Sequence, residues 1–196
     1  EPLVRPFRDR IRTSTPVTSV SRHEDHVLVN GERFDQVVFA CHSDQALSVL
    51  EDPHPLEREF LSALPYQTND VVLHTDTTLL PKRLGAWGSW NYHVSGDGNK
   101  PAIVTYNMNL LQTLDTDQTY CVTLNATGSI DPKTILYQTT YDHPVYTKKG
   151  FSAQGRHSEI SGINRTHYCG AYWGFGFHED GVRSGVRVAE HFGVSL

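Results

Sequence analysis

Four consecutive apolar residues, Val37-Val38-Phe39-Ala40, form a run without polar alternation. This pattern is typical of a strand that is covered on both faces, as in a parallel sheet. Far along the chain, Thr166-His-Tyr-Cys169 has the composition of a second strand, and a glycine-rich turn and a helix over about 181–192 follow it. We therefore expect these two segments to lie in one sheet, next to or near each other.

A hairpin precedes the apolar run. Asn30-Gly31 separates His26-Val-Leu-Val29 from the strand that begins at Phe34, and Asn-Gly supplies the two positive φ angles of a type I′ turn. An earlier strand is expected over about 15–21. The first part of the chain is therefore predicted to be a three-strand meander.

Short helices and a β-rich middle follow. We expect a helix capped by Ser43 that ends near residue 50, a second helix that opens at His54-Pro55, and a short one at Asp131-Pro132. Residues 148–165 are expected to be an irregular connection. The expected strands of one sizeable sheet are 71–75, 87–93, 102–107, 120–125 and 137–143.

Charge and cysteine content exclude several classes of protein. The 196 residues carry a net charge of −5, which argues against a nucleic acid or an anionic membrane as partner. Cys41, Cys121 and Cys169 are widely spaced, so neither a disulfide framework nor a zinc ribbon is indicated. We expect a cytoplasmic protein with no transmembrane segment and no metal. Because the sequence starts at Glu1, we expect it to be a piece of a longer protein.

The glycine-rich turn matches no phosphate-binding motif. Gly174-Phe-Gly176 resembles the start of GxGxxG, but Glu179 stands where the third glycine is needed. Gly176 and Gly181 have Walker A spacing, but Val182 replaces the lysine. Two interpretations stay open: a helix N-terminus offered to an anion or a polarised carbonyl, or glycines used for turn geometry alone.

Other clusters also have a structural alternative. Glu179 and Asp180, next to His178, are expected to cap the helix, because HExxH would need a histidine at residue 182. His42-Ser43-Asp44 contains three residue types of a catalytic triad, but Ser43 is expected to be a cap. The aromatic residues Trp87, Trp90 and Tyr92 suit either the wall of a substrate pocket or a strand that faces the core.

The stretch from Tyr168 through Gly176 and Gly181 to Ala189 resembles the C-terminal flavin-binding segment of the flavin-containing amine oxidase and phytoene desaturase superfamily. In that segment a strand ends in glycine, and a glycine-aromatic turn leads into a helix. Four stretches resemble a bacterial subgroup, the predicted NAD/FAD-binding proteins, which are often associated with cyclopropane fatty acid synthases. These stretches are Phe34-Asp-Gln-Val-Val-Phe-Ala-Cys-His42, Trp87-Gly-Ser-Trp-Asn-Tyr92, Thr105-Tyr-Asn-Met-Asn109 and His143-Pro-Val-Tyr146.

The resemblance implies a set of FAD contacts. The backbone of Val17 would meet the adenine, Gly170 would bind the cofactor where the strand ends, and the N–H groups of Gly181 and Val182 would face the pyrimidine edge of the flavin. A helix N-terminus stabilises the negative charge of reduced flavin. Phe177 falls where amine oxidases place one aromatic wall of the substrate cage. The sequence indicates no catalytic base and no covalent flavin anchor.

The resemblance also implies an α+β fold class. A β-rich substrate-binding domain, with a mixed sheet and a few helices, would occupy residues 52–165. Residues 1–51, with the three-strand meander, and 166–196, with a C-terminal strand-loop-helix, would be parts of an FAD-binding domain. The GxGxxG motif of the N-terminal Rossmann portion is absent from these residues, so this chain alone is expected to lack FAD.

The function implied is that of the C-terminal portion of an FAD-dependent oxidoreductase, which transfers a hydride from its substrate to flavin N5. The expected partners are the missing N-terminal Rossmann portion and a small hydrophobic substrate, for example a fatty acyl chain. Two alternatives stay open: a noncatalytic binding module that retains the substrate-domain fold, and a flavin-dependent isomerase.

Overall fold

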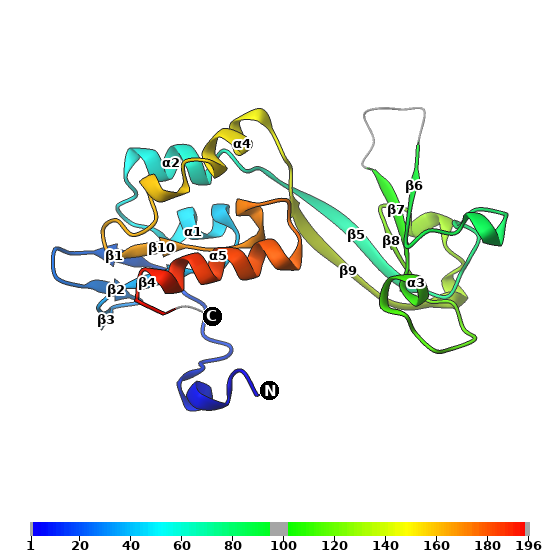
Figure 1. The fold of residues 1–196 in the computed structure, drawn as a ribbon, viewed down its shortest axis with the longest axis horizontal. Coiled ribbons are helices and arrows are strands. Elements are labelled where there is room, and N and C mark those ends of the chain that lie inside the picture. Colours follow the sequence, from blue (N-terminus) through cyan, green and yellow to red (C-terminus); the bar gives the residue numbers. More distant parts are fainter. Residues whose placement is uncertain (1, 95–101, 195–196) are drawn as a thin grey trace. The chain divides into compact units, whose positions relative to one another are not determined.

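The computed structural model describes residues 2–94 and 102–194. The chain forms two compact units: Glu1–Pro65 together with Pro144–Leu196 is the first, and Tyr66–His143 is the second (Figure 1). Both units contain helices and strands, so the fold class is α+β, as predicted. Among the described residues, no helix is both long enough and apolar enough to cross a bilayer.

The first unit opens with the predicted meander. Its antiparallel strands pair in the order β1 (Val20–Arg22), β2 (Val27–Val29) and β3 (Glu32–Phe34). Asn30 and Gly31 have φ angles of 49° and 80°, which confirms the type I′ turn. β1 starts later than predicted, because the side chain of Asn30, not a ladder, accepts the N–H groups just before it.

β4 (Val37–Phe39) and β10 (Thr166–Tyr168) form a two-stranded parallel sheet. Val37 lies opposite Thr166 and Phe39 opposite Tyr168, which confirms that the two distant segments share a sheet. The prediction that the apolar run is covered on both faces was wrong, since Val38 is 44% exposed. In the described part of the chain, β10 is the one strand that pairs with β4.

Two short helices follow β4, as predicted. α1 (Ser43–Val49) is capped by His42 and not by Ser43, which is the first helical residue and is buried. α2 (Pro55–Leu61) has proline in its first turn, and His54 Nδ1 accepts the N–H of Leu56 at 3.3 Å. Each of the two histidines therefore takes the position that serine or aspartate usually fills.

Two helices in the C-terminal part differ from the prediction. α4 (Lys148–Gln154) replaces part of the expected irregular connection, because Thr147 Oγ1 caps it by accepting the N–H of Gly150. α5 (His178–Glu190) starts before Gly181, where the sequence analysis placed its first turn. The described residues of the first unit also form three 3₁₀ helices: η1 (Arg5–Arg10), η5 (His157–Glu159) and η6 (Ala171–Trp173).

A buried ion pair crosses the core of the first unit. Arg22 on β1 donates to both carboxylate oxygens of Glu57 on α2, and Tyr168 Oη on β10 donates to the same carboxylate at 2.7 Å. The side chains of Arg22 and Glu57 are both 3% exposed. Burial raises the pKa of Glu57, but the hydrogen bonds from Arg22 and Tyr168 outweigh this effect and hold its pKa below the usual value. Three distant segments are thus joined at one carboxylate.

The second unit is built on one sizeable sheet, as predicted, but the β6–β7, β7–β8 and β5–β8 pairings are antiparallel, whereas a mixed sheet was expected. Its strand order is β6-β7-β8-β5-β9. The short helices around it are η2 (Leu84–Ala86), α3 (Met108–Gln112), η3 (Thr127–Ser129) and η4 (Pro132–Thr134). The strands are β5 (Tyr66–His74), β6 (Trp90–His93), β7 (Ile103–Asn107), β8 (Cys121–Leu124) and β9 (Ile135–Pro144).

The second unit is shorter than the 52–165 range that the sequence analysis assigned to a substrate domain. α2 and α4, from the two ends of that range, lie in the first unit, where they pack together. The backbone N–H of Val145 donates to Pro65 O at 2.8 Å within the same unit. The functional division at 52 and 165 stays a prediction.

Candidate functional site

The glycine-rich turn begins at the carboxyl end of β10. The Cys169 N–H donates to Phe39 O at 2.9 Å, and the Gly170 N–H donates to Ser184 Oγ at 2.8 Å. Gly170 has a φ of 156°, and a Cβ there would lie 2.5 Å from the ring of Tyr172. Geometry inside this chain is therefore sufficient to explain Gly170, and its role in cofactor binding stays a prediction.

Asp180 holds the second half of the turn. Its Oδ2 accepts the N–H groups of Phe175 and Phe177 at 3.0 and 3.1 Å. A Cβ at Gly174 would lie 2.5 Å from the Asp180 carboxyl, so this glycine makes room for the capping carboxylate. The predicted capping role of Asp180 is confirmed, whereas Glu179 is exposed and pairs with Arg183.

The N-terminus of α5 differs in register from the expected cofactor site. The Gly181 N–H donates to Phe177 O at 3.2 Å and is the first bond of the i to i−4 type in this helix. The first N–H groups of a helix lack such a partner, and here they belong to His178 and Glu179. A ligand at this helix end would therefore meet residues 178 and 179 before Gly181 and Val182.

An exposed aromatic patch surrounds this helix end. Phe177, the expected cage residue, is 54% exposed. Phe151 stacks on Tyr146 with ring centroids 5.9 Å apart and lies 6.2 Å from the ring of Phe175. Sequence reasoning missed Tyr146 and Phe151, since no spacing rule links them to Phe177. Phe151, Phe175, Phe177 and Tyr146 form what we call the aromatic patch.

A second feature of the first unit is an apolar groove of about 540 Å³ along β4, which we call the β4 groove. Val17, whose backbone was expected to meet the adenine, lines it and is 45% exposed. The other lining residues are Val20, Val29, Val37, Val38, Phe39, Ala40, Cys41, Gln45, Ser48 and Val49. The groove therefore follows the open side of the parallel sheet.

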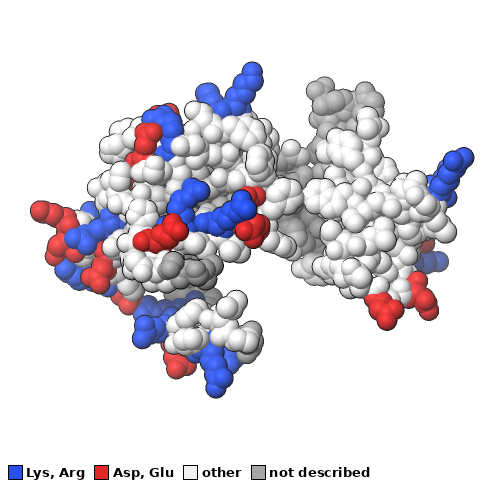
Figure 2. Space-filling model, viewed as in Figure 1, with Lys and Arg blue, Asp and Glu red and all other residues white. Residues whose placement is uncertain are grey.

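Positive charge gathers beside Val17. The N-terminal segment carries four arginines, Arg5, Arg8, Arg10 and Arg12 (Figure 2), although the whole chain is negative. Arg10 and Arg12 line a hollow of about 630 Å³ together with Val17. Arg12 pairs with Glu32, so part of this positive charge is neutralised within the chain.

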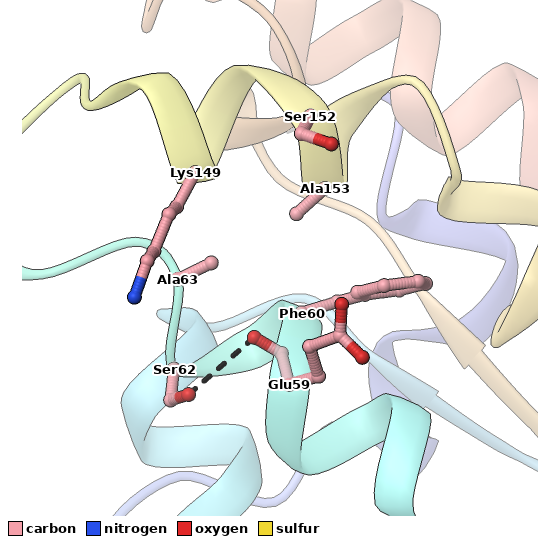
Figure 3. A pocket seen from close by; sticks show the side chains of 7 residues that line it. All are labelled: Glu59, Phe60, Ser62, Ala63, Lys149, Ser152 and Ala153. Carbon is pink, nitrogen blue, oxygen red and sulfur yellow. Dashed lines mark hydrogen bonds between the residues drawn. The ribbon is translucent and has the colours of Figure 1, made fainter.

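The cavity drawn in Figure 3 lies between α2 and α4 and has a volume of about 390 Å³. Phe60, Ala63 and Ala153 supply its apolar lining, and Glu59 and Lys149 bring opposite charges to it. Ser62 Oγ donates to Glu59 O at 3.4 Å. Nothing in this lining corresponds to a motif of the sequence, and we assign no role to the cavity.

The second unit carries an apolar groove of about 510 Å³ on one face of its sheet, which we call the sheet groove. Its lining residues are Val71, Leu73, Met108, Gln112, Leu114, Tyr120, Val122, Tyr137, Thr139 and Tyr141. Trp90 and Tyr92, two of the expected substrate-facing residues, lie on the same sheet face, since Trp90 pairs with Tyr106 and Tyr106 with Val122. Trp87 precedes β6, and its Nε1 donates to Pro81 O at 2.7 Å.

The thiols show no sign of activation. Burial raises the pKa of Cys41 and Cys169, and it raises the pKa of Cys121 to about 11. Within residues 2–94 and 102–194, no cluster of three or more His, Cys, Asp or Glu side chains is placed to hold a metal ion. Neither observation supplies a catalytic nucleophile.

No protein-family model and no curated protein matches the sequence. Solved structures match its fold. A CLA-producing fatty acid isomerase from P. acnes aligns with 90% of this chain at a TM-score of 0.56 and 16% identity, over 47% of its own length. Wild-type putrescine oxidase bound to putrescine aligns with 91% at a TM-score of 0.57 and 12% identity, over 48% of its own length. The chain thus has the fold of about half of each of these proteins.

Proposed function

We propose that this chain is the C-terminal half of an FAD-dependent oxidoreductase of the amine oxidase-like type. The observation that carries the proposal is the parallel pair β4–β10, with the glycine turn and α5 following β10. In open α/β sheets, ligands bind at the carboxyl ends of the parallel strands. The fold match to an oxidase and an isomerase supports the same assignment.

The residues at this position fit a flavin. The N–H groups of His178 and Glu179 open a helix of 13 residues, whose N-terminus carries roughly half a positive charge. A Cβ at Gly181 would lie 3.8 Å from Ala171, an ordinary contact, so packing inside this chain does not require a glycine there. We infer that Gly181 leaves room for the pyrimidine edge of the flavin to approach the first turn of α5, where the N–H groups of His178 and Glu179 are available, with Val17 and Gly170 toward the rest of the FAD.

FAD, when bound, supplies the group that accepts a hydride from the substrate. The chain's own residues bind the cofactor and orient the substrate beside it. The α5 N-terminus favours negative charge beside it, and the aromatic patch offers the exposed ring of Phe177 to the substrate.

The missing partner in this proposal is a Rossmann portion that contributes a strand to β4. Three observations support it: the exposed Val38, the β4 groove, and the open space that a Cβ at Gly185 would find on α5. An edge strand presents unpaired backbone groups that a further strand can take up. The three free cysteines fit a cytoplasmic location.

The test is to express the reading frame extended upstream of Glu1 and to record the visible spectrum of the purified protein. Bound flavin absorbs at about 450 nm and bleaches on reduction. Flavin binding followed by reduction with a hydrophobic substrate supports the oxidoreductase. An extended protein that never binds flavin would instead favour the noncatalytic binding module.

A flavin-dependent isomerase is the second candidate, and the match to the fatty acid isomerase favours it. It shares the flavin site proposed above but gives no net oxidation of the substrate. Product analysis separates the two: an isomerase returns a product of unchanged mass without consuming an electron acceptor.

A further inference from the structure

In the sheet of the second unit, polar side chains lie on the covered face and apolar side chains on the open face, which is the reverse of an ordinary half-buried sheet. On its covered face, Thr105 and Thr123 lie opposite each other and are fully buried, with Asn91 next in the row. Their polar groups are satisfied: the Thr105 and Thr123 hydroxyls are 2.9 Å apart, and His74 Nε2 lies 2.8 Å from Thr123 Oγ1. A one-residue slip in register would break these bonds, so the network fixes which face is covered.

Apolar and aromatic side chains occupy the opposite, open face. Trp90 is 56% exposed, Tyr92 64%, Tyr137 60% and Tyr141 56%. Monomeric soluble proteins rarely leave such continuous apolar surface uncovered, and an exposed patch of this kind marks a site of interaction.

Part of this face is concave. The sheet groove has a floor of Val71, Leu73 and Val122, and β9 supplies one side with Tyr137 and Tyr141. The other side comes from α3 and the residues after it, which contribute Met108, Gln112 and Leu114. Its volume of about 510 Å³ lies within the roughly 300–1,000 Å³ typical of small-molecule sites, so a ligand and not a flat protein surface suits this shape.

The chemistry of the groove is uncharged. Among the described residues that line it, none has a charged side chain; the polar groups are the tyrosine hydroxyls, one threonine and Gln112. The lining therefore offers neither an ammonium nor a carboxylate an ion-pair partner, and it suits the apolar part of a ligand. The flexible thioether of Met108 adapts to a chain of variable shape.

We propose that the sheet groove binds the hydrocarbon chain of a fatty acyl compound, with the polar head outside the groove. The role of this chain as the substrate rests on the function proposed above, but its binding does not require flavin. A short diamine such as putrescine, with a charge at each end, would find no ion-pair partner in this lining and would leave most of its apolar surface uncovered. A free fatty acid and a fatty acyl ester both present the required chain.

The experiment measures binding to the 196-residue chain without flavin. The probe is cis-parinaric acid, a polyene fatty acid that fluoresces more strongly in apolar surroundings. We expect saturable binding that palmitate displaces and putrescine does not. Displacement by methyl palmitate as well would show that the acyl chain is the recognised part, whereas displacement by palmitate alone would identify a free acid as the form bound; both outcomes support the proposal.

Two variants place a charge in the groove. Tyr137→Asp and Leu114→Asp should each weaken parinarate binding by at least about tenfold, because a carboxylate in the groove repels an apolar chain. Leu136→Asp is the matched control: Leu136 is 55% exposed on the same strand, does not line the groove, and points to the opposite face. It should change the affinity by less than about twofold.

Three results would overturn the proposal: no saturable binding to the wild-type chain, displacement by putrescine, or equal affinity of Tyr137→Asp and Leu114→Asp with the wild type. Dimerisation that Tyr137→Asp abolishes and Leu136→Asp does not would assign the face to a second copy instead. Failure of the oxidoreductase proposal gives a different pattern, in which the chain binds parinarate but the extended protein binds no flavin.

Discussion

Tyr168 and Phe39 lie opposite each other on neighbouring parallel strands, and their rings stack with centroids 5.5 Å apart and an interplanar angle of 10°. Phe39 comes before the whole second unit in the chain and Tyr168 comes after it. The core of the first unit therefore requires both ends of the sequence, and the same tyrosine joins the buried pair of Arg22 and Glu57.

The buried carboxylate gives the first prediction. Glu57→Gln removes the buried carboxylate that faces Arg22 and leaves this arginine with the half-exposed Asp52 as its ion-pair partner. We therefore expect a loss of about 3 kcal/mol in the free energy of unfolding, measured by urea denaturation. Glu59→Gln on the same helix is the control: Glu59 is 60% exposed in its pair with Arg156, and its loss should cost at most about 1 kcal/mol. Equal effects of the two changes would contradict a structural role for the buried pair.

The second prediction concerns acid stability. Burial lowers the pKa of His74, His157 and His167 below the value of an unfolded chain, so the folded state favours their neutral forms. The free energy of unfolding is therefore highest above about pH 6.5 and decreases as the pH drops below that value, because the unfolded chain then binds more protons than the folded chain. The slope approaches about 1.4 kcal/mol per pH unit for each histidine.

Urea denaturation between pH 8 and pH 5 measures this slope. His74→Gln removes one titrating group and keeps a side chain that can hydrogen-bond to Thr123, so the slope of stability against pH should be smaller than that of the wild type. Stability that is constant or rises toward pH 5 would be inconsistent with three buried neutral histidines.

Much of the first unit was predictable because local chemistry and long-range packing agree there. Asn30-Gly31 fixes its own turn, and the apolar run at Val37 has a partner of matching composition at Thr166. The cap of α1 and the start of α5 were predicted less well. In α1, His42 takes the capping position that Ser43 was expected to fill. In α5, the predicted cap Asp180 accepts the N–H groups of Phe175 and Phe177, so the helix begins at His178 and not at Gly181.

The candidate site was only partly predictable. Phe177, Trp90 and Tyr92 were singled out and are exposed, whereas Tyr146 and Phe151 were missed. The sheet groove could not be foreseen either. Its lining combines β5, β8, β9 and the α3 region, and the register that decides which side chains share a face follows from buried polar pairs such as Thr105 and Thr123.

The third prediction compares two glycines that both have open space around a Cβ. Gly31 has a φ of +80°, so Gly31→Ala should destabilise the chain by about 1–2 kcal/mol. Gly185 lies inside α5, and Gly185→Ala should stabilise it by up to about 1 kcal/mol through helix propensity. Thermal denaturation measures both stability changes, and two changes of the same sign would contradict the turn assignment.

The fourth prediction concerns the proposed flavin edge and uses the protein extended upstream of Glu1. Gly181→Val should weaken FAD retention, because a branched side chain blocks close approach to the backbone. In the 196-residue chain the same change should shift stability by less than about 1 kcal/mol, since Ala171 lies at an ordinary distance. Normal FAD retention by Gly181→Val would leave only a structural role for the turn.

Phe177→Ala is the companion variant for the aromatic patch. The Phe177 side chain is proposed to face the substrate, so flavin affinity should stay within about twofold while turnover falls by about tenfold. Flavin titration and steady-state kinetics separate the two effects. A loss of flavin affinity equal to the loss of turnover would assign Phe177 to the cofactor instead.

The absorbance spectrum near ~450 nm, recorded for the 196-residue chain and for the extended protein after incubation with FAD and removal of the excess, tests the central claim most directly. Without a Rossmann portion, the short chain should be colourless. The extended protein should be yellow, hold about one FAD per chain and bleach on reduction. A yellow short chain with stoichiometric FAD would contradict the need for the missing half, and an extended protein without flavin would contradict the flavoenzyme itself.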